Sequence, residues 1–276
     1  MKTSKYILIT GCSSGIGYEC AHILKKLDYT VITTARKDED VKRLKEEGLI
    51  SLQLDLDDSF SIDRVVKQVK EITDSKLYAL FNNAAYGQPG AVEDLSREVL
   101  KAQFETNLFG THELTVKILP MMIELGKGRI IQNSSVLGFA GMRYRGAYNA
   151  SKFALEGLSD TLRLELEGTG IYVSIIEPGP IRSNFRSNAL KKFLENIDRK
   201  NSRLSKIYEK KLEQLQSSED APFTLDPEAV AKALLHALES KNPKVRYRVT
   251  VPTYLFYWLK KILPDKVMDL ILRKVE

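Results

Sequence analysis

Tyr148 and Lys152 are the two residues of this chain whose types and spacing most directly suggest chemistry. A phenol has an ordinary pKa of about 10, so it exchanges protons poorly near neutral pH unless its anion is stabilised. Positions i and i+4 share one face of a helix, which would bring the lysine ammonium close to the phenol. We expect the ammonium to lower the pKa of Tyr148 by roughly 1–3 pH units. The pair is therefore a candidate general acid or base.

The spacing alone does not identify a site, because Tyr257 and Lys261 repeat it without a serine or a glycine-rich segment nearby. We interpret that second pair as structural. The first pair is accompanied by Ser135, thirteen positions before Tyr148, and by Asn107 further upstream. The whole constellation, rather than the pair, predicts hydride-transfer chemistry.

A glycine-rich turn at residues 11–17 predicts a nucleotide site. The turn follows an expected strand and opens an expected helix, which is the context that such a pattern requires. Glycines let the backbone approach a pyrophosphate, and the free N–H groups of the helix start provide positive potential. A plain turn is the alternative. The turn residues that we expect at the cofactor are Gly11, Ser13, Ser14, Gly15, Ile16 and Gly17.

The residue after the second expected strand favours NADP(H). An NAD-preferring protein places a carboxylate there against the ribose 2′-hydroxyl, whereas Arg36 can pair with a 2′-phosphate. A solvated loop arginine is the alternative. Asp55 closes the third strand and is a candidate acceptor for the adenine amino group, or else a cap for the following helix.

Short apolar runs alternate with helical patterns through most of the chain. Continuous apolar strands separated by helices indicate a parallel sheet covered on both faces. We predict a single α/β domain over residues 1–276, with a doubly wound, Rossmann-like parallel sheet of six or seven strands. Strands are expected at 6–10, 30–35, 50–54, 77–82, 129–133, 172–176 and 245–251, with one long helical stretch over 95–125 and another helix at 227–238.

The pattern changes after residues 178–180. A charged helical segment without a strand follows, and we predict a substrate lid at about 186–224, inserted after the sixth strand. Insertions beyond the carboxyl ends of parallel strands lie where such folds bind ligands. The insertion is thus expected near the nucleotide site.

Composition is that of an ordinary globular protein, with 43% hydrophobic and 28% charged residues and a net charge of +6. Basic residues gather at 186–217 and 241–276, but they alternate with other residues as on a solvated helix, so we expect no nucleic-acid partner. Two closely placed cysteines fit a reduced, cytoplasmic compartment, and three scattered histidines predict no metal site. No apolar run reaches the roughly 20 residues of a transmembrane helix.

The C-terminal segment, about 253–276, is amphipathic and basic. It combines Tyr254, Phe256, Tyr257 and Trp258 with two lysines. Peripheral contact with a membrane is one interpretation, and packing of the segment on its own domain or on a partner subunit is the other.

The chain resembles the short-chain dehydrogenase/reductase family over essentially its whole length. The resemblance rests on the turn Thr10-Gly11-x-x-x-Gly15-Ile16-Gly17, on Asn82-Asn83-Ala84, on Asn107, Ser135, Tyr148 and Lys152, and on Pro178-Gly179. One position departs, since Ala85 stands where the family usually has glycine.

The resemblance implies roles for these residues. Tyr148 would be the general acid or base, and Lys152 would lower its pKa while holding the nicotinamide ribose. Ser135 would hydrogen-bond the substrate oxygen, and Asn107 would hold a water that relays protons to the lysine. The further cofactor contacts that the resemblance implies are Leu56, Asn82, Ala84, Tyr148, Lys152, Pro178, Gly179 and Ile181.

The implied activity is NADP(H)-dependent interconversion of an alcohol and its ketone or aldehyde. Residues 175–182 and the charged insertion resemble the branch that includes 17β-hydroxysteroid and retinol dehydrogenases, which implies a hydrophobic substrate. The expected substrate-binding residues are Ser135, Tyr148, Leu137, Met142 and Phe185, with Phe139 and Leu190 nearby, although core packing would explain the apolar ones as well.

The resemblance also implies a homodimer or homotetramer packed through the helices near 108–125 and 148–168. Two rival functions remain. A non-catalytic NADP(H)-binding regulatory protein would keep the fold without turnover. An epimerase or dehydratase of nucleotide sugars would generally carry a longer C-terminal domain.

Overall fold

The computed structural model, which describes residues 5–216 and 220–274, contains one parallel sheet of seven strands in the order β3-β2-β1-β4-β5-β6-β7. Every neighbouring pair of strands is parallel. This topology confirms the predicted doubly wound, Rossmann-like sheet. The strands are β1 (Tyr6–Ile9), β2 (Thr30–Ala35), β3 (Ile50–Gln53), β4 (Leu77–Asn82), β5 (Gly128–Asn133), β6 (Ile171–Glu177) and β7 (Arg246–Arg248).

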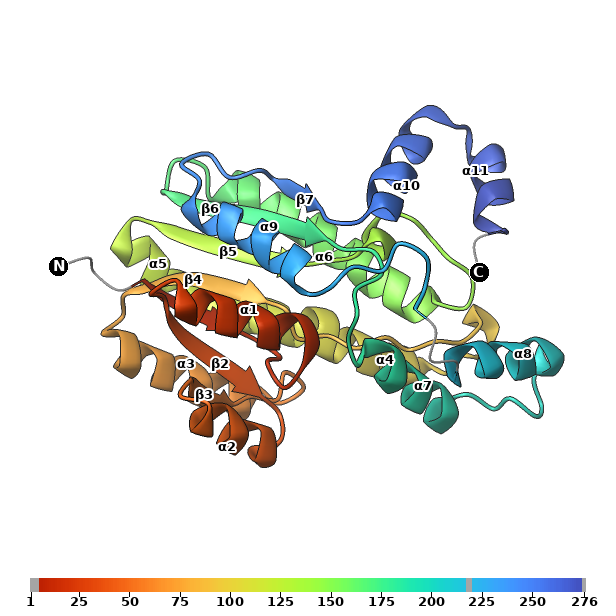
Figure 1. Ribbon diagram of the computed structural model, residues 1–276, viewed down its shortest axis with the longest axis horizontal. Coiled ribbons are helices and arrows are strands. Elements are labelled where there is room, and N and C mark those ends of the chain that lie inside the picture. Colours follow the sequence, from red (N-terminus) through yellow and green to blue (C-terminus); the bar gives the residue numbers. More distant parts are fainter. Residues whose placement is uncertain (1–4, 217–219, 275–276) are drawn as a thin grey trace.

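Helices cover both faces of the sheet (Figure 1). One face carries α1 (Gly15–Lys26), α2 (Asp38–Glu46) and α9 (Glu228–Glu239), whose buried side chains form a single cluster with the sheet. The other face carries α3 (Ser59–Thr73) and α5 (Thr111–Leu125), and the long helix α6 (Gly146–Glu165) packs against β6. Because all seven strands are parallel, their carboxyl ends lie along one edge of the sheet.

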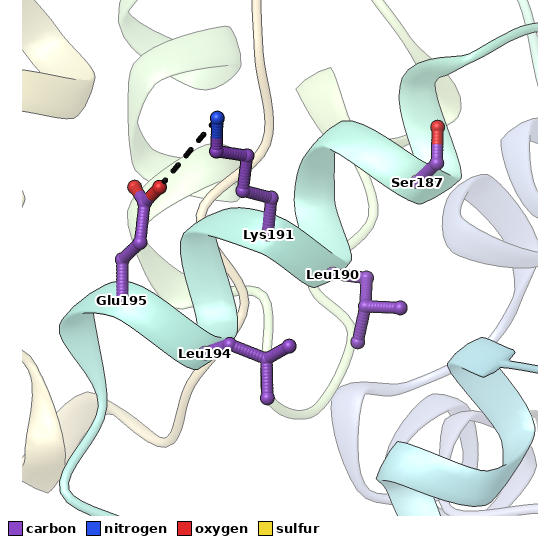
Figure 2. A pocket seen from close by; sticks show the side chains of 5 residues that line it. All are labelled: Ser187, Leu190, Lys191, Leu194 and Glu195. Carbon is purple, nitrogen blue, oxygen red and sulfur yellow. Dashed lines mark ion pairs between the residues drawn. The ribbon is translucent and has the colours of Figure 1, made fainter.

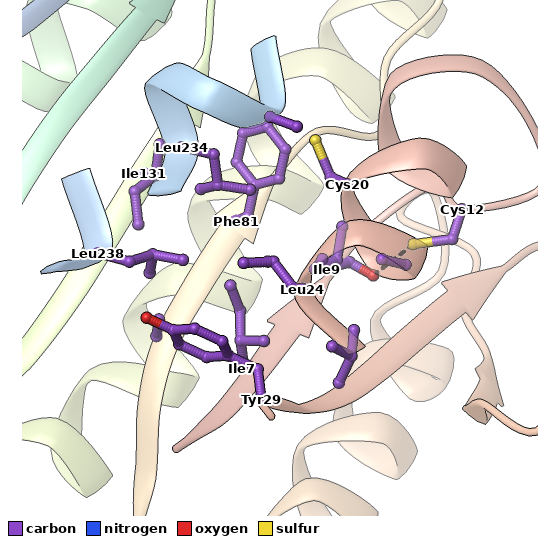
Figure 3. Packing of buried hydrophobic residues seen from close by; sticks show 14 of the residues in the cluster. Ile7, Ile9, Cys12, Cys20, Leu24, Tyr29, Phe81, Ile131, Leu234 and Leu238 are labelled. Atoms are coloured by element: carbon purple, nitrogen blue, oxygen red, sulfur yellow. Dashed lines mark hydrogen bonds between the residues drawn. The ribbon is translucent and has the colours of Figure 1, made fainter. Parts of the chain in front are cut away.

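Alternation along β1 explains why both faces are buried. Ile7 and Ile9 join the α1 and α9 cluster, whereas Leu8 joins the cluster on the opposite face, as the two-residue period of a strand requires. Figure 3 shows the first of these clusters, which includes Leu24 of α1, Leu234 of α9 and Phe81 of β4. Each fully buried aliphatic side chain of this kind stabilises the fold by about 1.5–3 kcal/mol.

The predicted helical stretch over 95–125 is confirmed from Arg97 to Leu125, although its winding changes within it. The chain forms a 3₁₀ turn at Val92–Asp94, the helix α4 at Arg97–Phe104, a π-helical turn at Glu105–Gly110, and then α5. Gly110 permits this path, since a Cβ there would lie 1.9 Å from the Leu56 carbonyl oxygen. The widened turn carries Asn107, and such π turns often occur at functional sites.

The predicted insertion forms two helices, α7 (Phe185–Asn196) and α8 (Ser205–Gln216), and part of its predicted span, residues 217–219, lies outside the described residues. The last strand is shorter than predicted because helix α10 (Val251–Ile262) begins at Val251, with a proline in its first turn. A break at Leu263 and Pro264 separates α10 from α11 (Asp265–Leu272), and the two helices stand together at one end of the molecule (Figure 1). Within the described residues, every helix is too short or too polar to cross a bilayer.

Candidate active site

The glycine turn after β1 has the backbone that its sequence predicts. Gly11 and Gly15 have φ angles of 70° and 60°, in the left-handed region that favours glycine. Gly17 is required for a different reason, since a Cβ at this position would lie 2.4 Å from the Gly11 carbonyl oxygen. The turn therefore presents bare backbone at the start of α1.

The segment after β4 holds this turn in place. The Thr10 hydroxyl accepts hydrogen bonds from the backbone N–H groups of Asn83 and Ala84, each at 2.9 Å. The Asn83 amide donates to the carbonyl oxygens of Thr10 and Gly11 at 2.9 and 3.1 Å. Two loops that are far apart in sequence thus form one rigid edge.

Asn82 and Asn83 have different environments, and Asn83 is the one that contacts the glycine turn. The Asn82 side chain is buried and donates to the Thr115 hydroxyl at 2.8 Å, inside the core. Adjacent positions of a strand point to opposite faces, so only Asn83 reaches the turn. The Asn-Asn-Ala motif indicated that this segment lies near the turn, but only the structure shows which asparagine side chain points toward it.

The loop after β6 also reaches the glycine turn. The Pro178 carbonyl accepts a hydrogen bond of 2.8 Å from the Val136 N–H, which ties this loop to the one after β5. A Cβ at Gly179 would lie 2.2 Å from the Thr250 hydroxyl, and a Cβ at Gly15 would lie 2.8 Å from the Ser183 side chain. Ile181 packs against the core cluster of α1, so the predicted cofactor residues of this loop lie on the same edge as the turn.

Two arginines lie at this edge, of which the sequence analysis named one. Arg36 is exposed directly after β2, as predicted. Arg43 of α2 donates a hydrogen bond to the Ser13 carbonyl in the glycine turn and pairs with Asp40 at 3.0 Å. Because Arg43 reaches the turn only through the packing of α2, no local sequence signal predicts it.

Asp55 does not cap the helix after β3. Its carboxylate accepts a hydrogen bond from the Asp57 N–H at 3.1 Å, and Asp58 is the residue that caps α3, by accepting from the Phe60 N–H. Leu56 is buried between this loop and the π-helical turn. The capping alternative for Asp55 is therefore wrong.

The four predicted catalytic residues come together beside the turn. Ser135 follows β5, while Tyr148 and Lys152 lie one turn apart on α6 and are almost completely buried. The Lys152 ammonium lies 5.7 Å from the centre of the Tyr148 ring and donates to the Asn133 carbonyl at 2.7 Å. The end of β5 and one face of α6 therefore form the site.

Asn107 joins the site through its neighbours. Its side-chain oxygen accepts from the Tyr86 N–H at 3.1 Å, and its amide donates to the Tyr86 carbonyl at 3.0 Å and to the Ser151 hydroxyl at 3.1 Å. Ser151 in turn donates to the Tyr148 carbonyl at 2.8 Å. Asn107 thus braces α6, and Ser151 is a supporting residue that had not been predicted.

The ionisation of the pair differs from the prediction. Burial raises the pKa of Tyr148 to about 12, against the opposing effects of the Ser135 hydroxyl and the Arg145 guanidinium. Burial lowers the pKa of Lys152 to about 8, and the Glu156 carboxylate opposes this change. The expected lowering of the Tyr148 pKa by Lys152 is not found, because desolvation dominates and the lysine is itself buried.

A cluster of buried charges lies behind Lys152, one helical turn further along α6. Arg246 pairs with Glu156 at 3.0 Å, with Asp160 at 2.6 Å and with Glu177 at 3.1 Å. Arg248 lies 3.2 Å from the second oxygen of Glu177. Burial raises the pKa of Glu177 to about 7, despite both arginines. The cluster joins α6, β6 and β7 one helical turn from Lys152.

The predicted apolar residues surround Tyr148. Leu137 and Met142 belong to its cluster, and the Phe185 ring lies 5.3 Å from the Tyr148 ring, centre to centre. Helices α10 and α11 also contribute Phe256 and Met268 to this cluster, so the C-terminal segment packs on its own domain, which was one of its two interpretations. A small cavity beside Tyr148 is lined by Gly87, Gln88, Pro89, Arg145, Phe185 and Ala189.

A shallower hollow lies on the outer side of α7, separate from this cavity (Figure 2). Leu190, which we expected near the substrate, lines the hollow together with Leu194, while Lys191 and Glu195 pair across it at 3.9 Å. The buried side of the same helix carries Ala189, toward Tyr148. Leu190 is therefore not part of the Tyr148 cavity.

The two cysteines, Cys12 and Cys20, are free and buried. Burial raises the pKa of the Cys12 thiol to about 12, so it stays protonated near neutral pH. Among residues 5–216 and 220–274, no cluster of three His, Cys, Asp or Glu side chains is arranged to hold a metal ion.

The chain is similar to known oxidoreductases over nearly its whole length. A family model described as short chain dehydrogenase matches residues 5–193. The chain is 44% identical to YbbO, an uncharacterized oxidoreductase of Escherichia coli strain K12, over 98% of this chain and 94% of the relative. It is 31% identical to the NADPH-dependent 3-dehydrocapnine reductase of Ornithobacterium rhinotracheale, over 98% and 96% of the two chains. The crystal structure of a short-chain dehydrogenase from Streptomyces avermitilis superimposes with a TM-score of 0.79 at 28% identity, covering 99% of this chain and 100% of that one.

Proposed function

The chain belongs to the short-chain dehydrogenase/reductase family, and on that premise we propose that it is an NADP(H)-dependent oxidoreductase that interconverts a hydrophobic alcohol and its ketone or aldehyde. One observation carries the proposal. Ser135, Tyr148 and Lys152 are buried, and Lys152 is linked to the glycine turn, whose bare backbone suits a dinucleotide, by a chain of hydrogen bonds. Lys152 donates to the Asn133 carbonyl, the Asn133 amide donates to Asn83, and Asn83 donates to the turn.

The residues at the sheet edge fit a dinucleotide. The positive φ angles of Gly11 and Gly15, and the space that only a glycine leaves at position 17, favour close approach of a pyrophosphate to the backbone. Arg36 and Arg43 are exposed beside this edge, where a 2′-phosphate would find two guanidinium groups. The relative from Ornithobacterium is named as NADPH-dependent, which supports the same cofactor.

The protein residues would supply proton transfer and charge stabilisation. The nicotinamide, when bound, donates or accepts the hydride. Tyr148 would donate its hydroxyl proton to the substrate oxygen during reduction, and its raised pKa keeps that proton in place near neutral pH. The Ser135 hydroxyl would hydrogen-bond the same oxygen and stabilise its developing negative charge.

Lys152 would hold a positive charge against the phenolate that Tyr148 becomes, while the Asn133 carbonyl fixes the ammonium in position. Asn107 and Ser151 would keep α6 in register with the π-helical turn, so that the two catalytic side chains face one point. Relay of protons to Lys152 through a water at Asn107 remains part of the proposal.

The substrate would occupy the apolar region around Tyr148. Leu137, Met142 and Phe185 favour a hydrophobic alcohol or carbonyl compound, as does the resemblance of residues 175–182 to the 17β-hydroxysteroid and retinol dehydrogenases. Phe185 is the first residue of α7, so the insertion would act as the substrate lid. The free, buried thiols of Cys12 and Cys20 fit a reducing compartment such as the cytoplasm.

We also propose that the protein is a homodimer or homotetramer. Phe109, Val116 and Ile123 recur every seven residues on α5 and its preceding turn, and each is nearly half exposed. Leu158 and Leu164 of α6 are exposed as well. The apolar stripe of α5, with the exposed leucines of α6, favours a helix-to-helix contact between subunits. Light scattering that gave a monomer mass would reject the oligomer.

The activity is tested by following NADPH absorbance with steroids, retinal, aliphatic aldehydes, 3-dehydrocapnine, keto acids and sugars, with NADH in parallel. We expect turnover of apolar carbonyl compounds, and we expect Tyr148→Phe to lower kcat at least about 100-fold. Tyr257→Phe is the matched control, because it removes a hydroxyl with the same lysine spacing outside the site. Tight NADPH binding without turnover of any compound would favour the non-catalytic regulatory protein instead.

A further inference from the structure

Helix α10 presents an apolar stripe to solvent. The side chains of Val251, Tyr254, Leu255, Trp258 and Ile262 are exposed by 59%, 50%, 52%, 56% and 72%. Their spacing of three and four residues places all five on one face of the helix. Exposed stripes of this kind, rimmed by polar residues, mark contact with a partner or a membrane.

The opposite face of α10 is anchored on the active site, so the outward direction of the stripe is set by packing. Phe256 is buried in the cluster that contains Tyr148, and Leu259 packs against the same cluster. The Lys260 ammonium hydrogen-bonds the Phe139 carbonyl of the loop beside the site. The Arg248 guanidinium stacks 3.3 Å from the centre of the Tyr257 ring. The stripe is therefore a fixed surface, one helix away from Tyr148.

The charge around the stripe indicates an anionic partner. Residues 251–274 carry five basic side chains, Lys260, Lys261, Lys266, Arg273 and Lys274, against two acidic ones, Asp265 and Asp269. Lysine is depleted in protein–protein interfaces, whereas apolar helices with flanking lysines bind anionic lipid surfaces. Exposed Tyr254 and Trp258 have the amphipathic rings that gather at the headgroup level of a bilayer.

We propose that α10 and α11 dock the protein on an anionic bilayer, with the stripe of α10 in the interfacial layer. Exposed Val267 and Leu270 extend the apolar surface onto α11. The docked orientation places the Tyr148 cluster next to the lipid, so an apolar substrate would reach it without crossing water. This last step rests on the proposed function, whereas docking itself does not.

The test is co-sedimentation of the full chain with vesicles of phosphatidylcholine alone, or of phosphatidylcholine and phosphatidylserine. We expect binding that needs phosphatidylserine. Lys261→Gln with Lys266→Gln should weaken it about 30-fold, since each basic side chain near an anionic surface contributes about fivefold. Leu255→Ser with Ile262→Ser should weaken it at least about tenfold, because these side chains would no longer be buried in the lipid.

The matched controls are Lys26→Gln with Lys67→Gln, and Phe60→Ser with Phe223→Ser, which change exposed side chains on other surfaces. They should bind as the unchanged protein does. Melting temperature shows whether each variant folds, and NADPH titration without vesicles reports the cofactor site separately, so failure of docking and failure of the proposed function are distinguishable. Equal binding by stripe and control variants would overturn the proposal. Concentration-dependent self-association that the stripe variant loses, without vesicle binding, would assign this face to a second copy of the chain and would also overturn it.

Discussion

Replacing Arg246 by methionine should destabilise the protein strongly, because this arginine compensates carboxylates that have little access to water. Glu177 is 1% exposed and Glu156 is 9% exposed at the side chain, and the guanidinium lies 3.1 and 3.0 Å from their oxygens. Methionine keeps much of the side-chain volume but removes the charge. Breaking a buried ion pair from one side costs about 3–5 kcal/mol in the free energy of unfolding. The third partner, Asp160, is 38% exposed and adds little.

The loss should depend on pH in a defined direction. Burial raises the pKa of folded Glu177 from 4.5 to about 7, so the folded state binds this proton more tightly than the unfolded chain does. Such a group stabilises the fold most at low pH, and that contribution is lost as the pH rises to about 7. Removing Arg246 removes a group that lowers the pKa of Glu177, so the pKa should rise further. The loss in the free energy of unfolding caused by Arg246→Met should therefore reach its full size at pH 8 and be smaller at pH 5.

Urea unfolding at pH 5 and pH 8 measures both effects. Arg182→Met is the control, because Arg182 also pairs with two carboxylates, Asp220 and Asp226, but is 56% exposed. That exposed change should cost at most about 1 kcal/mol. Glu177→Gln should remove much of the penalty of Arg246→Met in a double-mutant cycle. A penalty for Arg246→Met no larger than that of Arg182→Met, or one that is equal at the two pH values, would refute the reasoning.

Three further outcomes are expected. Gly17→Ala should weaken NADPH binding at least about tenfold in a fluorescence titration, because the new Cβ would lie 2.4 Å from the Gly11 carbonyl oxygen. Gly157→Ala is the control and should leave NADPH affinity unchanged, because nothing lies within 4 Å of its new Cβ. Equal affinities for the two variants would contradict the requirement that Gly17 pack closely on Gly11. Arg36→Ser should weaken NADPH binding about 10- to 100-fold and leave NADH binding unchanged, since it would remove the proposed charge-assisted hydrogen bond to the 2′-phosphate. A parallel loss for both cofactors would argue against that contact. Carbonyl reduction should slow as the pH rises through about 8, because burial lowers the pKa of Lys152 to about 8 and the ammonium then loses its proton. A kcat that stays level to pH 10 would show that this charge is not needed.

The elements and the order of the motifs were predictable because their signals are local. Apolar runs such as Tyr6–Ile9 and the glycine turn that follows carry their own conformational preferences, so the parallel sheet and the nucleotide edge follow from the chain alone. The spacing of Tyr148 and Lys152 on one helix is local as well. The same motifs predicted the family, and the similarity to known proteins confirms it.

Features that depend on distant contacts were missed. Asn83, rather than Asn82, clamps the glycine turn, and Arg43 reaches that turn only because α2 packs beside it. The π-helical turn that carries Asn107 requires Gly110 to pass the Leu56 carbonyl, two segments that are far apart in sequence. No window of neighbouring residues contains that information.

Residue types and their spacing determined which side chains could take part in catalysis, because rules of helix and strand geometry act over a few residues. The tertiary structure decided their protonation, because burial of Tyr148 and Lys152 shifts both pKa values in ways that a pair in water would not show. It also decided that α10 covers the site with one face and exposes Trp258 on the other, since the direction of an amphipathic helix is set by what it packs against.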